Sequence, residues 1–129
     1  MIECMAHILI VDDAFEAQEP LGKYLEKAGY EVTLVPNGRE ALGELIYTVP
    51  DVVIVDLLMP EMDGPSLIEV TRAYLRLQSL PVIVLTAMED GPLIARAQNA
   101  KVNAILKKTK ATFEDIKRAI EDAIVRIPG

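Results

Sequence analysis

Short apolar runs alternate along the chain with stretches of helical periodicity. Continuous Val, Ile and Leu runs mark strand-like segments near residues 6–11, 51–55 and 81–85, and a shorter run lies near 103–106. Strands that are buried on both faces lack a polar alternation, so these runs predict a parallel sheet with helices on each side. The segment 31–35 alternates more, which predicts a strand at the edge of the sheet.

Helix boundary signals lie between the predicted strands. Asn37 and Glu40 resemble a capping box, and Pro65 and Pro92 suit the first turns of two further helices. Thr112 predicts the N-cap of a last helix. That helix is expected to bury a stripe formed by Phe113, Ile116, Ile120, Ile124 and Ile127.

The first helix contains an irregular position. Pro20 lies well inside the helical stretch 14–28, and an interior proline removes a backbone hydrogen bond and clashes with the preceding turn. The helix therefore either kinks at Pro20 or starts near Glu19, and both alternatives are open at this point.

Five strand–helix units with right-handed crossovers predict a doubly wound α/β sandwich. In its flavodoxin-like form, (βα)5, the parallel five-stranded sheet has the order 2-1-3-4-5, which makes strands one and three neighbours at the switch point. No linker, repeat or low-complexity segment interrupts the pattern. We expect residues 1–129 to form a single domain with a core from about 6 to 126.

Polar residues follow the predicted strands at their carboxyl ends, which is the ligand-binding edge of such sheets. Asp12 and Asp13 end the first strand, Asp56 the third, Thr86 the fourth and Lys107 the fifth. Three adjacent carboxylates repel one another unless a divalent cation or a raised pKa relieves the repulsion. An all-oxygen site suits Mg²⁺. A metal, a hydroxyl and a lysine around one aspartate predict phosphoryl transfer to that aspartate.

Charge and cysteine usage limit the class of protein. The net charge of −7 argues against direct nucleic-acid binding, which needs basic patches. No apolar stretch approaches the roughly 20 residues of a membrane span, so no membrane insertion is expected. The single cysteine, Cys4, cannot form an internal disulfide, which favours a cytoplasmic location.

Four segments together resemble the receiver domain of bacterial two-component response regulators. They are Ile10–Asp13, the stretch Asp56–Gly64 with sequence DLLMPEMDG, Leu85–Ala87, and Lys107. The stretch Asp56–Gly64 is the most specific of these, and the likeness extends from Ala6 to about Arg126. The resemblance implies a signalling receiver rather than an enzyme that turns over a separate substrate.

The resemblance also implies roles for individual residues. Asp56 resembles the phosphoacceptor, Asp13 a direct Mg²⁺ ligand and Asp12 a ligand through water. The carbonyl of Leu58 is expected as a further ligand.

Two polar side chains complete the site that the resemblance implies. Thr86 resembles the switch hydroxyl, and Lys107 the lysine that pairs with the phosphoryl group. The donor is expected to be a sensor histidine kinase or a histidine phosphotransfer protein, and the output a docking or relay step with a downstream protein target. If these 129 residues are the full protein, we expect a stand-alone receiver; if they are part of a longer protein, we expect an output domain outside them.

Two positions depart from the family pattern. Lys108 stands where such proteins usually have proline after the lysine, and Ala104 stands where an aromatic residue usually lies three positions before it. These departures keep open a pseudo-receiver, a constitutive interaction module that is not phosphorylated.

Two enzymatic or cofactor-binding alternatives are weaker. A haloacid dehalogenase-type hydrolase needs a second acid two residues after its nucleophile, where this chain has Leu58 after Asp56. A flavodoxin-like FMN binder needs a phosphate loop after the first strand, where Asp12 and Asp13 would repel phosphate. The resemblance further implies that the side chains two residues after the phosphoacceptor and two residues after the switch threonine border the path of the attacking water. These are Leu58 and Met88, neither of which can orient water, so we expect slow hydrolysis of a phosphorylated Asp56.

Overall fold

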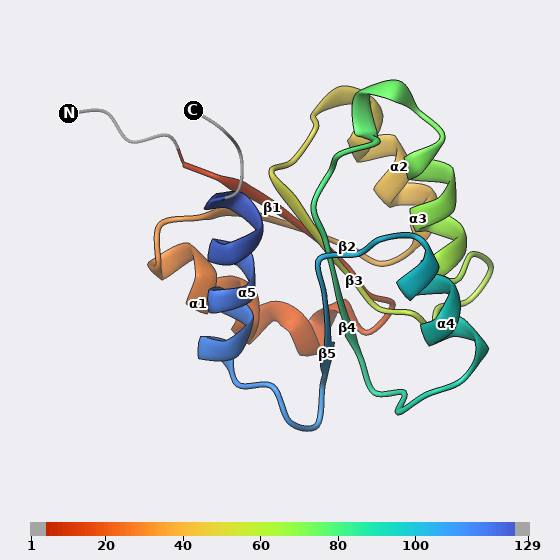
Figure 1. Ribbon diagram of the computed structural model, residues 1–129. Coiled ribbons are helices and arrows are strands. Elements are labelled where there is room, and N and C mark those ends of the chain that lie inside the picture. Colours follow the sequence, from red (N-terminus) through yellow and green to blue (C-terminus); the bar gives the residue numbers. More distant parts are fainter. Residues whose placement is uncertain (1–4, 126–129) are drawn as a thin grey trace.

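The computed structural model describes residues 5–125, and its centre is a five-stranded parallel sheet (Figure 1). The strand order is β2-β1-β3-β4-β5, as the sequence predicted, and β2 lies at one edge. The strands are β1 (His7–Val11), β2 (Glu31–Val35), β3 (Val52–Val55), β4 (Val82–Thr86) and β5 (Ala104–Lys107).

Five α-helices cover the two faces of the sheet. Figure 1 shows α1 and α5 on one face and α2, α3 and α4 on the other, which confirms the predicted doubly wound sandwich. The helices are α1 (Glu19–Lys27), α2 (Gly38–Tyr47), α3 (Gly64–Arg72), α4 (Pro92–Asn99) and α5 (Phe113–Val125), and two 3-10 turns are η1 (Phe15–Gln18) and η2 (Leu75–Leu77).

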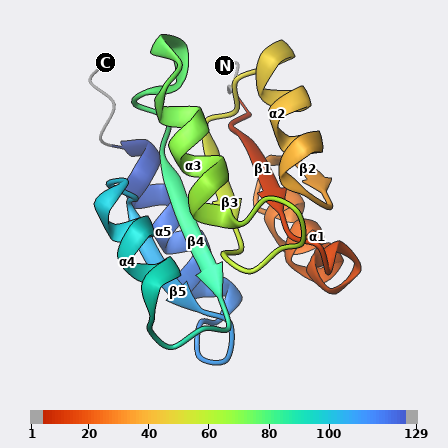
Figure 2. The ribbon, with the colours of Figure 1, turned by 90° about the vertical axis from the view of Figure 1, so that its right-hand side faces the viewer.

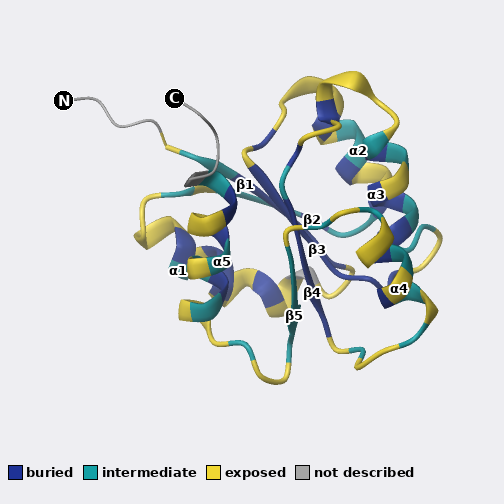
Figure 3. Cartoon of the chain, in the orientation of Figure 1, coloured by how far each residue is buried: buried dark blue, intermediate teal, exposed yellow. Residues whose placement is uncertain are grey.

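Two apolar clusters form the core, one on each face of the sheet (Figure 3). Side chains alternate between the faces along each strand. In β1, Leu9 and Val11 pack toward α2, α3 and α4, whereas Ile8 and Ile10 pack toward α1 and α5. Every residue of β3 and β4 is buried, which explains their uninterrupted apolar sequence.

The irregular start of the first helix is resolved by the structure. Helix α1 begins at Glu19, so Pro20 lies in its first turn, where a missing N–H is tolerated. The preceding residues form the 3-10 turn η1 and place Gln18 beside the end of β1. Of the two alternatives, the late start is confirmed.

The predicted helix caps are present. Asn37 Oδ1 accepts a hydrogen bond from the Glu40 N–H at 2.8 Å. Thr112 Oγ1 accepts from the Asp115 N–H at 3.0 Å, and the Thr112 N–H donates to Asp115 Oδ2 at 2.9 Å, which closes a reciprocal capping box.

The buried stripe of α5 is confirmed in its centre only. Ile116 and Ile120 are buried, and Ile124 is partly buried. Phe113 was expected in the core but is 40% exposed, because it lies at the helix start with its ring against Tyr24, 5.3 Å between centroids. Ile127 lies outside the described residues.

Candidate functional site

The carboxyl ends of β1 and β3 bring three carboxylates together. Val11 pairs with Val55 in the parallel ladder, so the residues that follow them, Asp12 and Asp56, become neighbours. Asp12, Asp13 and Asp56 each offer an oxygen atom, and these atoms lie within 4.8 Å of one another. Figure 2 shows this edge of the sheet at the lower end of the β4 arrow. The predicted convergence of the three residues is confirmed.

The three carboxylates differ in burial and in hydrogen bonding. Asp12 and Asp56 are buried, and Asp13 is exposed. Asp12 Oδ1 accepts from the Ala14 N–H, and Asp12 Oδ2 accepts from Gln18 Nε2, both at 2.9 Å. These protein donors occupy Asp12, so Asp13 and Asp56 are the carboxylates with more freedom to bind a ligand.

Gln18 is a site residue that the sequence analysis missed. Its side chain is buried and its amide holds Asp12 from η1. Only the 3-10 turn before Pro20 brings Gln18 to this position, and a lone glutamine in a predicted helix carries no signal for such a role.

The lysine at the carboxylates is Lys108 and not Lys107. Lys108 Nζ lies 2.7 Å from Asp12 Oδ2 and 3.1 Å from Asp56 Oδ2. Lys107 Nζ instead donates to the carbonyl oxygens of Met88 and Glu89, each at 2.7 Å. The prediction that Lys107 approaches Asp56 is therefore wrong by one residue.

The alternation of side chains along β5 explains this correction. Ile105 packs with the α2, α3 and α4 cluster, whereas Ala104 and Leu106 pack with the α1 and α5 cluster. The Lys107 side chain lies on the same face as Ile105 and points to the loop before α4. The Lys108 side chain points to the opposite side and reaches the carboxylates. A register error of one residue reverses every such assignment.

With Lys108 as the site lysine, the two departures from the family pattern fall on different residues. The residue three positions before the site lysine is Ile105 rather than Ala104, and it is an aliphatic side chain packed against the α4 side. The residue after the site lysine is Thr109, which again is not proline.

Burial and charge set the protonation behaviour of the site. Burial raises the pKa of the Asp56 carboxyl; the Lys108 ammonium offsets part of that increase, and the Asp12 charge adds to it. Burial alone would lower the pKa of Lys108, but the hydrogen bonds and charges of Asp12 and Asp56 outweigh this effect and raise the Lys108 pKa. The lysine therefore stays charged and holds the two buried carboxylates together.

A cavity of about 420 Å³ opens beside Asp56. Its lining consists of Asp13, Asp56, Leu58, Met59, Pro60, Thr86, Ala87 and Met88. Thr86 is fully buried, and its Oγ1 accepts a hydrogen bond from the Met88 N–H at 3.2 Å. The hydroxyl proton of Thr86 remains available as a donor. A small anion in this cavity can thus reach the Asp56 carboxylate and the Thr86 hydroxyl.

The donor set fits a magnesium ion. Three carboxylate oxygens in one cluster, one of them on the exposed Asp13, match the preference of Mg²⁺ for hard oxygen ligands and retained waters. Leu58 lines the same cavity, as its expected carbonyl role requires.

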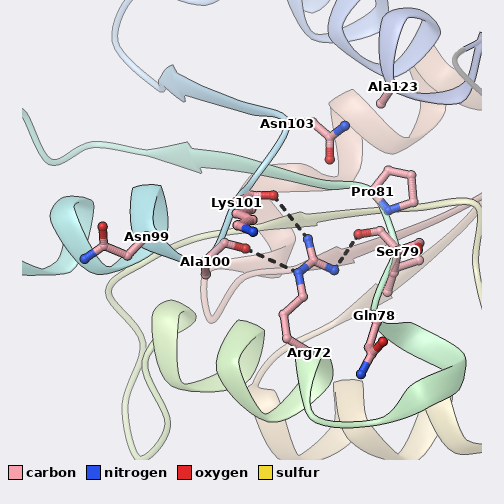
Figure 4. Close-up of a pocket in the computed structure, with 10 residues that line it drawn as sticks. Arg72, Gln78, Ser79, Pro81, Asn99, Ala100, Lys101, Asn103 and Ala123 are labelled. Atoms are coloured by element: carbon pink, nitrogen blue, oxygen red, sulfur yellow. Dashed lines mark hydrogen bonds between the residues drawn. The ribbon is translucent and has the colours of Figure 1, made fainter.

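A larger cleft, of about 720 Å³, lies at the amino ends of β4 and β5, away from the carboxylates (Figure 4). Arg72 points into it and donates to the carbonyl oxygens of Leu80 at 2.7 Å, and of Leu77, Ala100 and Lys101 at 3.3–3.4 Å. The guanidinium thus joins the end of α3 to the loops before β4 and β5. This arrangement stabilises the fold and leaves Arg72 few donors for a ligand.

The chain matches a known family model and known proteins over most of its length. Residues 8–121 match the response regulator receiver domain model. The chain is 39% identical over 122 residues to the transcriptional regulatory protein GltR of Pseudomonas aeruginosa, covering 81% of this chain and 50% of GltR. It is 31% identical over 121 residues to the sensory transduction protein RegX3 of Mycolicibacterium smegmatis, covering 81% and 52%. The chain thus spans about half the length of these curated relatives.

A solved structure agrees with the sequence comparison. The signal receiver domain of a histidine kinase from Syntrophus aciditrophicus superposes with a TM-score of 0.85 at 32% identity, over 96% of each chain. Separately, no helix within residues 5–125 has the length and apolarity that a bilayer crossing requires.

Proposed function

The chain belongs to the response regulator receiver domain family of two-component signalling, and from this premise we propose that Asp56 accepts a phosphoryl group. The observation that carries the proposal is the cluster of Asp12, Asp13 and Asp56 with the Lys108 ammonium at 2.7 and 3.1 Å, beside an open cavity. The donor is the phosphohistidine of a sensor histidine kinase or of a histidine phosphotransfer protein.

The transfer is a displacement at phosphorus. An ionised Asp56 oxygen forms the new bond to phosphorus as the phosphorus–nitrogen bond of the donor breaks, and the electron pair returns to the imidazole. Catalysis of such a step consists mainly of positioning and charge neutralisation. The cavity beside Asp56 gives the donor access to this oxygen, and Lys108 holds the carboxylate in place.

The other side chains act on the phosphoryl oxygens. The Thr86 hydroxyl donates to one oxygen, and the Lys108 ammonium turns from the carboxylates to pair with another. Asp12, Asp13, Asp56 and the Leu58 carbonyl would hold Mg²⁺. When bound, the ion neutralises carboxylate repulsion and phosphoryl charge.

The output is a protein–protein step. We propose that phosphorylated Asp56 changes the docking of a downstream protein, or passes its phosphoryl group on in a relay, in the cytoplasm. The net charge of −7 supports a protein partner over nucleic acid. The pseudo-receiver alternative predicts the same docking without phosphorylation.

The test is intact mass after incubation with acetyl phosphate and Mg²⁺. We expect the wild type to gain one phosphoryl group and Asp56→Asn to gain none. We expect Lys108→Met to react much more slowly, whereas Lys110→Met, which alters an exposed lysine nearby, reacts like the wild type. No gain in the wild type, with either acetyl phosphate or a phosphorylated histidine phosphotransfer protein as donor, would favour the pseudo-receiver.

A further inference from the structure

Lys107 makes contacts that the proposed phosphoryl transfer does not use. Its ammonium donates at 2.7 Å to two consecutive carbonyl oxygens, those of Met88 and Glu89, in the loop between β4 and α4. Hydrogen bonds from an ionised donor are about twice as strong as neutral ones. The last residue of β5 thus holds the loop that follows β4.

The loop has few other hydrogen bonds, and its Met88 side chain packs against the apolar cluster on the α2, α3 and α4 face. Within the described residues, the one further hydrogen bond of residues 87–90 runs from the Met88 N–H to Thr86 Oγ1, at 3.2 Å. Ala87 and Met88 also line the cavity beside Asp56. The backbone of this wall is therefore held by the Lys107 ammonium, beside the packing of the Met88 side chain.

These contacts form a continuous chain of polar groups. The Lys107 ammonium fixes the Met88 carbonyl, and the N–H of Met88 fixes the oxygen of the Thr86 hydroxyl. A hydroxyl that accepts from this N–H has its own proton free to donate into the cavity. The orientation of Thr86 is thereby coupled to a lysine that does not line the cavity.

We propose that Lys107 is a positioning residue that orients the Thr86 hydroxyl toward the phosphoryl group by holding the loop of residues 87–90. The proposal rests on the proposed phosphorylation of Asp56. Two adjacent lysines then divide the work: Lys108 acts on the carboxylates and the phosphoryl group, and Lys107 acts on the loop.

The first test is made on the unphosphorylated protein. Hydrogen exchange of the Met88 backbone amide, the hydrogen-bonded amide of this loop, is expected to be faster in Lys107→Met than in the wild type, with the sheet unchanged. Lys110→Met, an exposed lysine three residues further on, is the matched control and is expected to exchange like the wild type. Unchanged exchange in the loop of Lys107→Met would overturn the proposal, whether or not Asp56 is phosphorylated.

The second test is a double-mutant cycle on the rate of phosphorylation by acetyl phosphate with Mg²⁺. We expect Lys107→Met to slow the reaction about threefold to tenfold, within the range of coupling through a shared network. In the Thr86→Ala background the same substitution is expected to have no further effect. Additive effects would show that Lys107 does not act through Thr86, and would overturn the proposal while leaving Asp56 as the acceptor.

Discussion

The contact between the start of α3 and the phosphoacceptor strand gives the sharpest test of the structure. Gly64 is the first residue of α3, and its N–H donates to the Leu57 carbonyl at 2.9 Å. A Cβ atom added at Gly64 would lie 2.4 Å from the Asp56 carbonyl oxygen and 2.8 Å from the Leu57 Cα. Both atoms belong to the backbone, so no side-chain rotation can relieve the overlap.

The expected cost follows from this geometry. Backbone shifts forced by an added methyl group in a packed site cost about 1–3 kcal/mol, and here the shift falls on the segment that carries Asp56. Gly43 is the matched control, because it lies within α2 and has no atom within 4 Å of its added Cβ. Gly43→Ala should stabilise the protein by roughly 0.5–1 kcal/mol, since alanine loses less backbone entropy.

Urea unfolding of the two variants at pH 7 measures the difference. We expect Gly64→Ala to unfold at lower urea than the wild type and Gly43→Ala at higher urea, with a gap of about 1.5–4 kcal/mol between them. We also expect slower phosphorylation of Asp56 in Gly64→Ala. A Gly64→Ala variant as stable as Gly43→Ala would refute the close approach of α3 to the Asp56 backbone.

Three further predictions concern the site and the opposite cleft. Burial raises the pKa of Asp56, so the folded state binds this proton more tightly than the unfolded chain, and the contribution of Asp56 to stability falls as pH rises above about 4. Asp56→Asn should therefore be more stable than the wild type at pH 7 without Mg²⁺, by a margin that shrinks toward pH 4. A margin that stays constant with pH in urea unfolding would contradict this. Leu58 is 64% exposed, lines the cavity and cannot orient water, so phosphorylated Asp56 in the purified protein with Mg²⁺ should have a half-life well above seconds. Leu58→Asn should shorten this half-life roughly threefold or more by orienting water. A wild-type half-life of seconds would contradict the reasoning. Arg72→Met should lower the free energy of unfolding by about 2–3 kcal/mol, because it loses hydrogen bonds to backbone carbonyls. The matched control Arg76→Met alters an exposed arginine and should change the free energy of unfolding by less than about 0.5 kcal/mol. Equal effects of the two substitutions would show that the Arg72 contacts contribute nothing.

The apolar pattern was sufficient to predict the architecture. Uninterrupted runs such as 52–55 are unsuited to a half-exposed strand, and their alternation with helical stretches leaves a doubly wound sheet as the packing that buries them. The carboxyl-end rule then predicted that Asp12, Asp13 and Asp56 converge, which the ladder between β1 and β3 produces. These features are local or periodic, and so a single sequence contains them.

Other features depend on how distant segments meet. The sequence analysis assigned Lys107 to the site where the structure has Lys108. Two adjacent lysines differ only in the face of β5 to which they point, and the pairing of β5 with β4 decides that face. Gln18 reaches Asp12 only because η1 precedes α1, and Gly64 is required only because α3 passes the Asp56 backbone. The sequence by itself determined the sheet, its layers and the acidic cluster, since hydrophobic period and strand ends specify them. The tertiary structure alone decided which lysine serves the carboxylates and which holds the loop, since that depends on register between strands.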